Sequence, residues 1–271
     1  MSRLQQLLET GGLAQVSTEI MQVVLPSIRL KAYSMEEAQL EPGATKFGGA
    51  PNLSAANLWP ECDGVPLPFV AQINLSEVTS CDPMRLLPIR GLLSFFFDID
   101  AFFDSWPRRQ STWRVLYDSD APTDLQRVAI PEMIARRRRY RSSAVTCSTE
   151  ITLPDYSQYD STSVERLGLS RPLTDEEEQA YYEVQAQLAG RAGTQRHIPL
   201  HRLLGHPDEV QWDMHCELEG PPNDWQLLFQ MGSDDVPDTE WGDTGRIYYW
   251  IRTRDLAKRD FSKVKLILQS T

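Results

Sequence analysis

Two stretches of this chain share one pattern of apolar strands, and this repeat restricts the fold more than any other feature of the sequence. The first stretch covers residues 67–75 and, after a loop, 91–97. The second covers residues 225–231 and 245–251. In each stretch a glutamine is followed by a large apolar residue, and a glycine opens the second strand. We interpret the pattern as a diverged internal duplication of a β-rich unit.

The remaining elements are predicted from apolar spacing and from capping residues. Helices are expected at 3–9 and 17–25, and a longer one begins at Thr174, where Thr-Asp-Glu-Glu has the form of a capping box. The strand at 91–97 is apolar at nearly every position, so we expect burial on both faces. Further strands are predicted at 28–32, 112–117, 144–153, 210–217 and 263–269.

These elements predict an α+β, mainly β fold in which two related sheet-rich units pack into one globule with a connecting helix. We expect a single domain over 1–271. Its parts are a helical segment at 1–26, a first unit at 27–154, a helical connector at 155–198 and a second unit at 199–271.

Charge and composition restrict the kind of partner. The formal net charge is −11, which argues against nucleic acid as the main ligand and favours encounter with a basic protein. No run of apolar residues is long enough to span a membrane, and the N-terminus lacks an apolar signal region. We therefore expect a cytoplasmic protein. Its four scattered cysteines are expected to be reduced thiols.

An acidic loop is the first candidate for a binding surface. It carries Asp234, Asp235, Asp238 and Glu240, a density that suits either a solvated rim or a docking surface for a basic partner. The spacing departs from that of an EF-hand loop. His197, His201 and His215 likewise lack the spacing of a closed metal site, so we predict no metal and no cofactor.

Two further charged groups have structural explanations as well as functional ones. Asp98, Asp100 and Asp104 follow an aromatic strand, where they terminate the strand or, less simply, act as paired carboxylates. The arginine cluster at 136–141 either pairs with the acids at 175–178, forms a solvated helix face, or holds an anion.

Gln72 and Gln230 pose a sharper question, because a buried amide that lacks partners costs about 1–3 kcal/mol. Their equivalent positions favour a structural clamp on backbone groups across the two units. The alternative is a ligand cleft between the units, formed by Gln72, Gln230, Trp241 and Asp243. No nucleophile motif is present, and we assign no catalytic residue.

Several short motifs resemble the YwqG-like family, a bacterial domain family of unknown function. In the first unit they are Gly48-Gly49-x-Pro51, Trp59-Pro60, Gly64-x-Pro66-Leu67, Phe69, Gln72-Ile73-Asn74-Leu75 and Gly91-Leu92-Leu93-x-Phe95-Phe96. In the second they are Leu204-Gly205-x-Pro207, Gln211, Trp225-x-Leu227-Leu228-x-Gln230, Trp241-Gly242-Asp243-x-Gly245, Asp255-Leu256 and Phe261. The resemblance implies a cytosolic protein with a duplicated, sheet-rich body and no established cofactor.

The same resemblance implies a function, because members of such families occur as immunity proteins beside antibacterial toxins. We therefore expect a non-enzymatic binding protein, most specifically an immunity protein that occludes a basic toxin through Asp234, Asp235, Asp238 and Glu240. The alternative is a small-ligand-binding protein or enzyme with a cleft between the units.

Overall fold

Residues 3–54, 57–105, 108–119, 125–160, 162–191, 198–211 and 213–271 are described by the computed structural model. Within these ranges ten strands form one sheet in the order β14-β13-β12-β11-β1-β10-β2-β6-β7-β8, and every neighbouring pair is antiparallel. The strands are β1 (Leu25–Ser34), β2 (Lys46–Phe47), β6 (Phe69–Asn74), β7 (Leu92–Phe97), β8 (Trp113–Asp118), β10 (Ser143–Thr152), β11 (His201–Leu203), β12 (Trp225–Gly232), β13 (Arg246–Arg252) and β14 (Lys265–Gln269).

The two longest strands, β1 and β10, form the centre of this sheet. They pair over their whole length, from Leu25 opposite Thr152 to Ser34 opposite Ser143. Beyond β1 the sheet continues through the short strand β11 and then through β12, β13 and β14. Beyond β10 it continues through the short strand β2 and then through β6, β7 and β8. Strand β1 of the first unit also pairs with β11 of the second unit, and β10 also pairs with β2. The two halves are therefore joined through their own backbone hydrogen bonds.

One aromatic core lies between the halves. The ring of Phe95 on β7 lies 4.7 Å from that of Phe229 on β12 and 5.0 Å from that of Tyr249 on β13. The next residue, Phe96, points to the other face of the sheet and packs in a separate cluster with Phe69. All six residues of β7 are buried, so the prediction of burial on both faces is confirmed.

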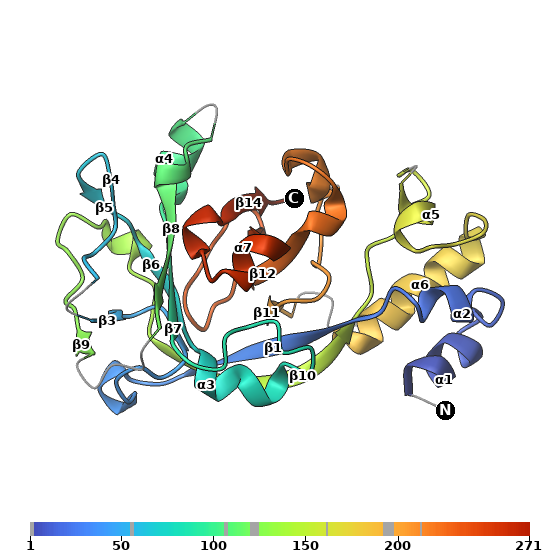
Figure 1. Cartoon of the computed structure of the whole chain (residues 1–271), viewed down its shortest axis with the longest axis horizontal. Helices are drawn as coiled ribbons and strands as arrows, with labels where there is room; N and C mark the ends of the chain where they lie inside the picture. Colours follow the sequence, from blue (N-terminus) through green and yellow to red (C-terminus); the bar gives the residue numbers. More distant parts are fainter. Residues whose placement is uncertain are drawn as a thin grey trace.

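The sheet curls so that its far ends approach each other (Figure 1). Trp113 on β8 donates its indole N–H to the carbonyl of Val264, at 2.9 Å, just before β14. The hydroxyl of Tyr249 reaches the carbonyl of Phe96 at 3.4 Å. These contacts close the core from the side that the strand ladder leaves open.

A helical lobe extends from one end of β1 and β10 (right in Figure 1). It contains α1 (Arg3–Thr10), α2 (Ser17–Ile20), α5 (Ser163–Arg166) and α6 (Asp175–Leu188). The predicted capping box is confirmed: the Thr174 hydroxyl accepts from the Glu177 N–H, and the Glu177 carboxylate accepts from the Thr174 N–H. Tyr181 and Val184 of α6 pack in the lobe's own hydrophobic cluster. This packing fixes α6 beside the end of β10.

Shorter elements complete the described chain. They are the strands β3 (Asn52–Leu53), β4 (Glu61–Cys62), β5 (Val65–Pro66) and β9 (Gln126–Arg127), the α-helices α3 (Leu75–Val78), α4 (Ile99–Asp104) and α7 (Thr253–Ala257), and the 3₁₀ turns η1 (Glu37–Gln39), η2 (Thr79–Cys81), η3 (Gln110–Thr112), η4 (Arg136–Arg138), η5 (Met214–Glu217), η6 (Pro222–Asp224) and η7 (Phe261–Lys263).

One predicted strand is wrong, and one predicted helix is shorter than expected. The strand expected at 210–217 is absent from the described part of that range, where Asp213 accepts from the His215 N–H and starts the turn η5 instead. The helix expected at 17–25 ends at Ile20, since β1 already begins at Leu25. Val16 occupies the N-cap position of this helix, and its side chain forms no capping hydrogen bond. No helix in the described ranges is both long and apolar enough to cross a membrane.

Candidate functional site

A cleft of about 610 Å³ lies where the helical lobe meets the sheet. We call it the α6 cleft. Three parts of the chain form it: the end of β10 with the segment that follows, one face and the C-terminal end of α6, and the segment from 200 to 209. Its lining residues are Ile151, Thr152, Leu153, Asp155, Gln179, Tyr182, Glu183, Gln185, Ala186, Gln187, Leu188, Ala189, Arg191, Leu200, Arg202, Pro207, Asp208 and Glu209.

Buried arginines form one end of the α6 cleft, which we call the arginine pole. Arg202 on β11 is only 6% exposed, and its Nε lies 2.9 Å from a Glu150 carboxylate oxygen. Arg191, just after α6, lies 2.8 Å from the Asp208 carboxylate. Burial would raise the pKa of Asp208, but the surrounding guanidinium groups hold it below its ordinary value. Burial lowers the pKa of both arginines.

Two carboxyl groups form the other end, which we call the carboxyl pole. Burial raises the pKa of Asp155 to about 6 and that of Glu209 to about 8. The Glu209 side chain is 5% exposed, and its nearest cation is Arg166 at 3.5 Å. For Glu209, burial outweighs this attraction. Perturbed carboxyls in a cleft are typical of binding and catalytic sites.

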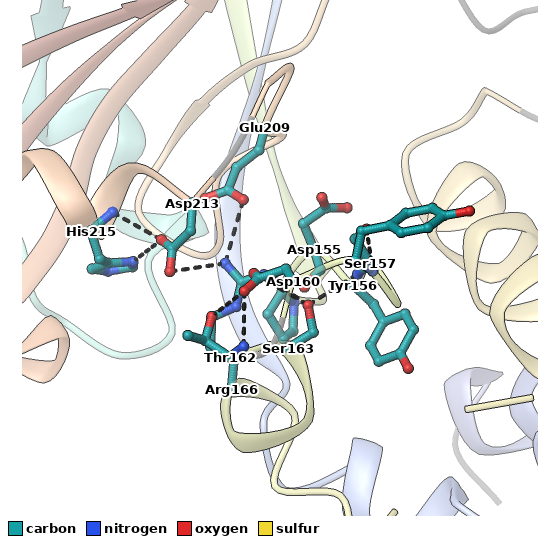
Figure 2. Close-up of polar contacts among 12 residues, drawn as sticks. Asp155, Tyr156, Ser157, Asp160, Thr162, Ser163, Arg166, Glu209, Asp213 and His215 are labelled. Atoms are coloured by element: carbon teal, nitrogen blue, oxygen red, sulfur yellow. Dashed lines mark hydrogen bonds and ion pairs between the residues drawn. The ribbon is translucent and has the colours of Figure 1, made fainter. Parts of the chain in front are cut away.

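Arg166 of α5 connects the carboxyl pole to the residues behind it (Figure 2). It lies 2.9 Å from Asp160 and 3.4 Å from Asp213, in addition to Glu209. Asp213 in turn contacts the His215 ring nitrogen at 2.7 Å. No contact is drawn to the Asp155 carboxylate in Figure 2, and Asp155 forms no ion pair with any described residue. The single guanidinium group of Arg166 thus forms ion pairs with three carboxylates.

The predicted acidic loop lies elsewhere, between β12 and β13. Asp234 is mostly buried and lies 2.8 Å from the His201 ring nitrogen, so it holds the loop against the sheet. Asp235, Asp238 and Glu240 are exposed. Asp238 comes within 3.6 Å of Arg141. The loop therefore presents three carboxylates to solvent while its base is fixed.

The residues predicted for a cleft between the units are placed in the core. Gln72 accepts from the Asn52 N–H and donates to the Ala44 carbonyl. Gln230 accepts from the Asp208 N–H and donates to the Leu200 carbonyl. Each amide clamps backbone within its own half, whereas we had expected clamping across the units.

Trp241 and Asp243 complete that predicted set. Trp241 is fully buried and packs against Phe97 and Tyr140. The Asp243 side chain is exposed, while its carbonyl accepts from the Thr271 N–H at the chain's end. The lining of the α6 cleft includes none of Gln72, Gln230, Trp241 or Asp243.

The arginine cluster and the Asp98 group stabilise each other. Arg138 forms two hydrogen bonds with Asp100, and Arg137 adds a third, so the pairing expected with the acids at 175–178 is wrong. Asp98 directly follows β7 and caps α4 by accepting from the N–H groups of Asp100 and Ala101.

Metal binding finds no support in the geometry of the described residues, where no group of three or more His, Cys, Asp or Glu side chains is placed to hold an ion. His197 lies outside the described residues. His201 contacts Asp234, and His215 contacts Asp213, so these two histidines belong to different sites.

Residues 45–270 match the family model of a domain of unknown function designated DUF1963. The chain belongs to this family. The matched region includes both halves of the sheet except β1, together with every residue of the α6 cleft. A search of curated proteins finds no match.

Proposed function

We propose that this DUF1963 protein binds a small polar ligand in the α6 cleft. The observation that carries the proposal is the cleft itself, which is lined by ionisable side chains of both signs from three separate parts of the chain. Its volume of about 610 Å³ is within the range of small-molecule sites. Burying so much charge costs free energy of folding, and a ligand that pairs with it recovers part of that cost.

A cavity-filling substitution tests this proposal. Ala186 lies half-buried on the α6 wall, so Ala186→Trp fills the cleft and leaves its charges unchanged. Glu176→Trp, on the exposed first turn of α6, is the matched control. We expect at least one compound in a panel of amines, amino acids, carboxylates, sugars and phosphates to raise the Tm of wild type and of Glu176→Trp but not of Ala186→Trp. A shift that survives Ala186→Trp, or no shift with any compound, contradicts the proposal.

A second candidate function is immunity to a basic toxin. It is favoured by the exposed carboxylates of Asp235, Asp238 and Glu240 on a loop whose base is fixed by Asp234, and by the net charge of −11. A coexpression test is direct. In cells that coexpress a basic toxin, growth inhibition should be relieved by the wild-type chain and not by a variant with these three residues changed to lysine. Equal protection by both chains would exclude the loop as the contact surface.

We further propose that the two halves arose by duplication, as in the YwqG-like proteins that the sequence resembles, and that the protein works in the cytoplasm. The strand order supports the duplication, because both sides of the central pair follow the same sequence of one short and three longer strands. In both halves a buried glutamine pairs across the sheet with a buried cation: Gln72 with Lys46, and Gln230 with Arg202.

A further inference from the structure

The arginine pole of the α6 cleft holds more positive charge than its own carboxylates neutralise. Four guanidinium groups share two carboxylates there. Their ion pairs are Arg29–Glu150 at 2.5 Å, Arg202–Glu150 at 2.9 Å, Arg191–Asp208 at 2.8 Å and Arg246–Asp208 at 3.1 Å. Arg191 and Arg202 line the cleft. Arg202 is buried and Arg191 is mostly buried, so bulk water screens their excess charge weakly.

The carboxyl pole has the opposite imbalance. Arg166 is divided among Asp160, Glu209 and Asp213, and Asp155 forms no ion pair with the described residues. The backbone N–H of Met214 also favours the charged form of Glu209, yet burial and the neighbouring acids oppose it. The cleft is therefore electrically bipolar.

The two poles lie at different levels of α6. Near the carboxyl pole, Gln185 donates to the carbonyl of Pro154, the residue before Asp155, at 2.9 Å. At the arginine pole, Arg29 donates to the carbonyl of Ala189 at 3.1 Å, and Arg191 follows two residues later. An α-helix rises about 1.5 Å per residue, so the poles are separated by on the order of 6–10 Å along α6. Between them Leu153, Ala186 and Leu200 offer apolar surface.

We propose that the ligand of the α6 cleft is a zwitterion with well-separated charges, an ω-amino acid or a short peptide, with its amine at Asp155 and Glu209 and its carboxylate at Arg191 and Arg202. This inference rests on the proposed function of the cleft. A purely anionic ligand leaves the carboxyl pole unpaired, and a purely cationic ligand leaves the arginine pole unpaired. Only a ligand with both charges satisfies both ends.

Four probes with the same six-carbon chain test the two head groups separately: aminocaproate, caproate, hexylamine and hexanol. Isothermal titration calorimetry of the full chain at physiological salt should give the tightest binding for aminocaproate. Removing either charged group should weaken binding about tenfold or more, because a charge-assisted hydrogen bond is lost and its partner in the cleft is left unpaired. Hexanol should bind weakest. Ala186→Trp should abolish all binding.

A double-mutant cycle locates the amine. Asp155→Asn should weaken aminocaproate about tenfold and leave caproate unchanged, because only aminocaproate carries the group that Asp155 contacts. Glu176→Gln, an exposed carboxylate on α6 outside the cleft, should change neither affinity. Equal losses for the two ligands would show that Asp155 acts on the shape of the cleft and not on the amine.

Proton release gives an independent readout at Glu209. The groups that face this carboxyl are Arg166 of α5, Asp155, and Asp213 before η5, and Tyr182 and Glu183 of α6 line the same cleft. Since its pKa is about 8, Glu209 is largely protonated at neutral pH, and an arriving amine should displace the proton. Titrations in buffers of different ionisation enthalpy should show this release with aminocaproate, none with caproate, and none in Glu209→Gln.

The outcomes separate this inference from the proposed function. Preferred binding of caproate, hexylamine or hexanol that Ala186→Trp abolishes would overturn the zwitterion and keep the cleft as a ligand site. Failure of all four probes would also overturn it, and the wider panel with Ala186→Trp would then decide the proposed function. Binding of aminocaproate that survives Ala186→Trp would place the ligand elsewhere and overturn both.

Discussion

At Gln72 and Gln230 a buried side-chain amide takes the place of backbone pairing. Each glutamine bridges an N–H and a carbonyl that lie on either side of a short strand in the sequence, β2 for Gln72 and β11 for Gln230, and each is 0% exposed. Removing the amide takes from both backbone groups the partner that the folded chain gives them. At Gln230 the backbone group held is the N–H of Asp208, so this clamp also positions a carboxylate of the cleft.

Gln72→Met and Gln230→Met should therefore each lower the free energy of unfolding by about 1–3 kcal/mol or more. Urea denaturation measures the change, with Gln22→Met on the exposed surface as the control. Gln230→Met should also weaken ligand binding in the cleft, and Gln72→Met should not. A fully stable pair of variants would contradict the clamp.

The raised pKa of Glu209 leads to a second prediction at the residue scale, which concerns the pH dependence of stability. The folded state holds a proton up to a pKa of about 8, whereas an unfolded glutamate loses it near a pKa of about 4.3. Between these values the folded state binds more protons, so stability falls as pH rises. His206 changes stability in the opposite direction. Burial lowers its pKa to about 4, so between this value and its unfolded pKa of about 6.5 the unfolded state binds more protons and stability rises with pH.

Thermal denaturation between about pH 6.5 and pH 8 separates the effect of the glutamate from that of His206. Wild type should lose stability as pH rises towards 8, and Glu209→Gln should lose less. Glu176→Gln should follow wild type, because this side chain is exposed. Parallel curves for wild type and Glu209→Gln would show that the carboxyl is already ionised in the folded protein.

Helix α6 shows how one element supplies both the lobe and the cleft. One face packs Tyr181 and Val184 into the lobe, and Tyr182 and Ala186 face the cleft. Its first turn carries four acidic residues at the positive end of the helix dipole, and Thr174 caps it. The position of the cleft wall therefore depends on a well-formed N-terminal end of α6.

Thr174→Ala should lower stability by about 1 kcal/mol, as loss of a threonine cap does in other helices. The change is measured by urea denaturation against Thr18→Ala, which alters an exposed threonine in α2. If the two substitutions cost the same, the capping box contributes no more than an ordinary surface threonine.

At the scale of the molecule, the halves share a sheet and a core, so we expect them to unfold together. Phe95 of the first half packs directly on Phe229 and Tyr249 of the second. Phe95→Ala should cost about 3–5 kcal/mol. Hydrogen exchange should then show faster opening of β6 and of β12 alike. Faster exchange confined to β6 would mean that the halves are separate folding units.

The strands at the centre of each half could be predicted from the sequence because their signal is local. A long apolar run such as 91–97 has few alternatives to a buried strand. The three-residue strand β11 could not, since its pairing depends on β1 and β12, which are distant in sequence. The pairing of Arg138 with Asp100 was missed for the same reason.

The α6 cleft was also beyond sequence reasoning. Asp155 and Glu209 are single carboxylates, separated by more than fifty residues and without a motif around either. What distinguishes them is burial and mutual proximity, which only the fold creates. The acidic loop attracted attention instead because its charges are contiguous. Contiguous charge is readily solvated, whereas scattered charge that the fold gathers and buries needs a partner.

The most direct test of the account is a crystal structure of the full chain with aminocaproate. We predict that the ligand lies in the α6 cleft, with its amine within hydrogen-bond distance of Asp155 or Glu209 and its carboxylate directed to Arg191 or Arg202. A ligand bound outside the cleft, or one bound within it with its carboxylate at Asp155 and Glu209, would contradict the account.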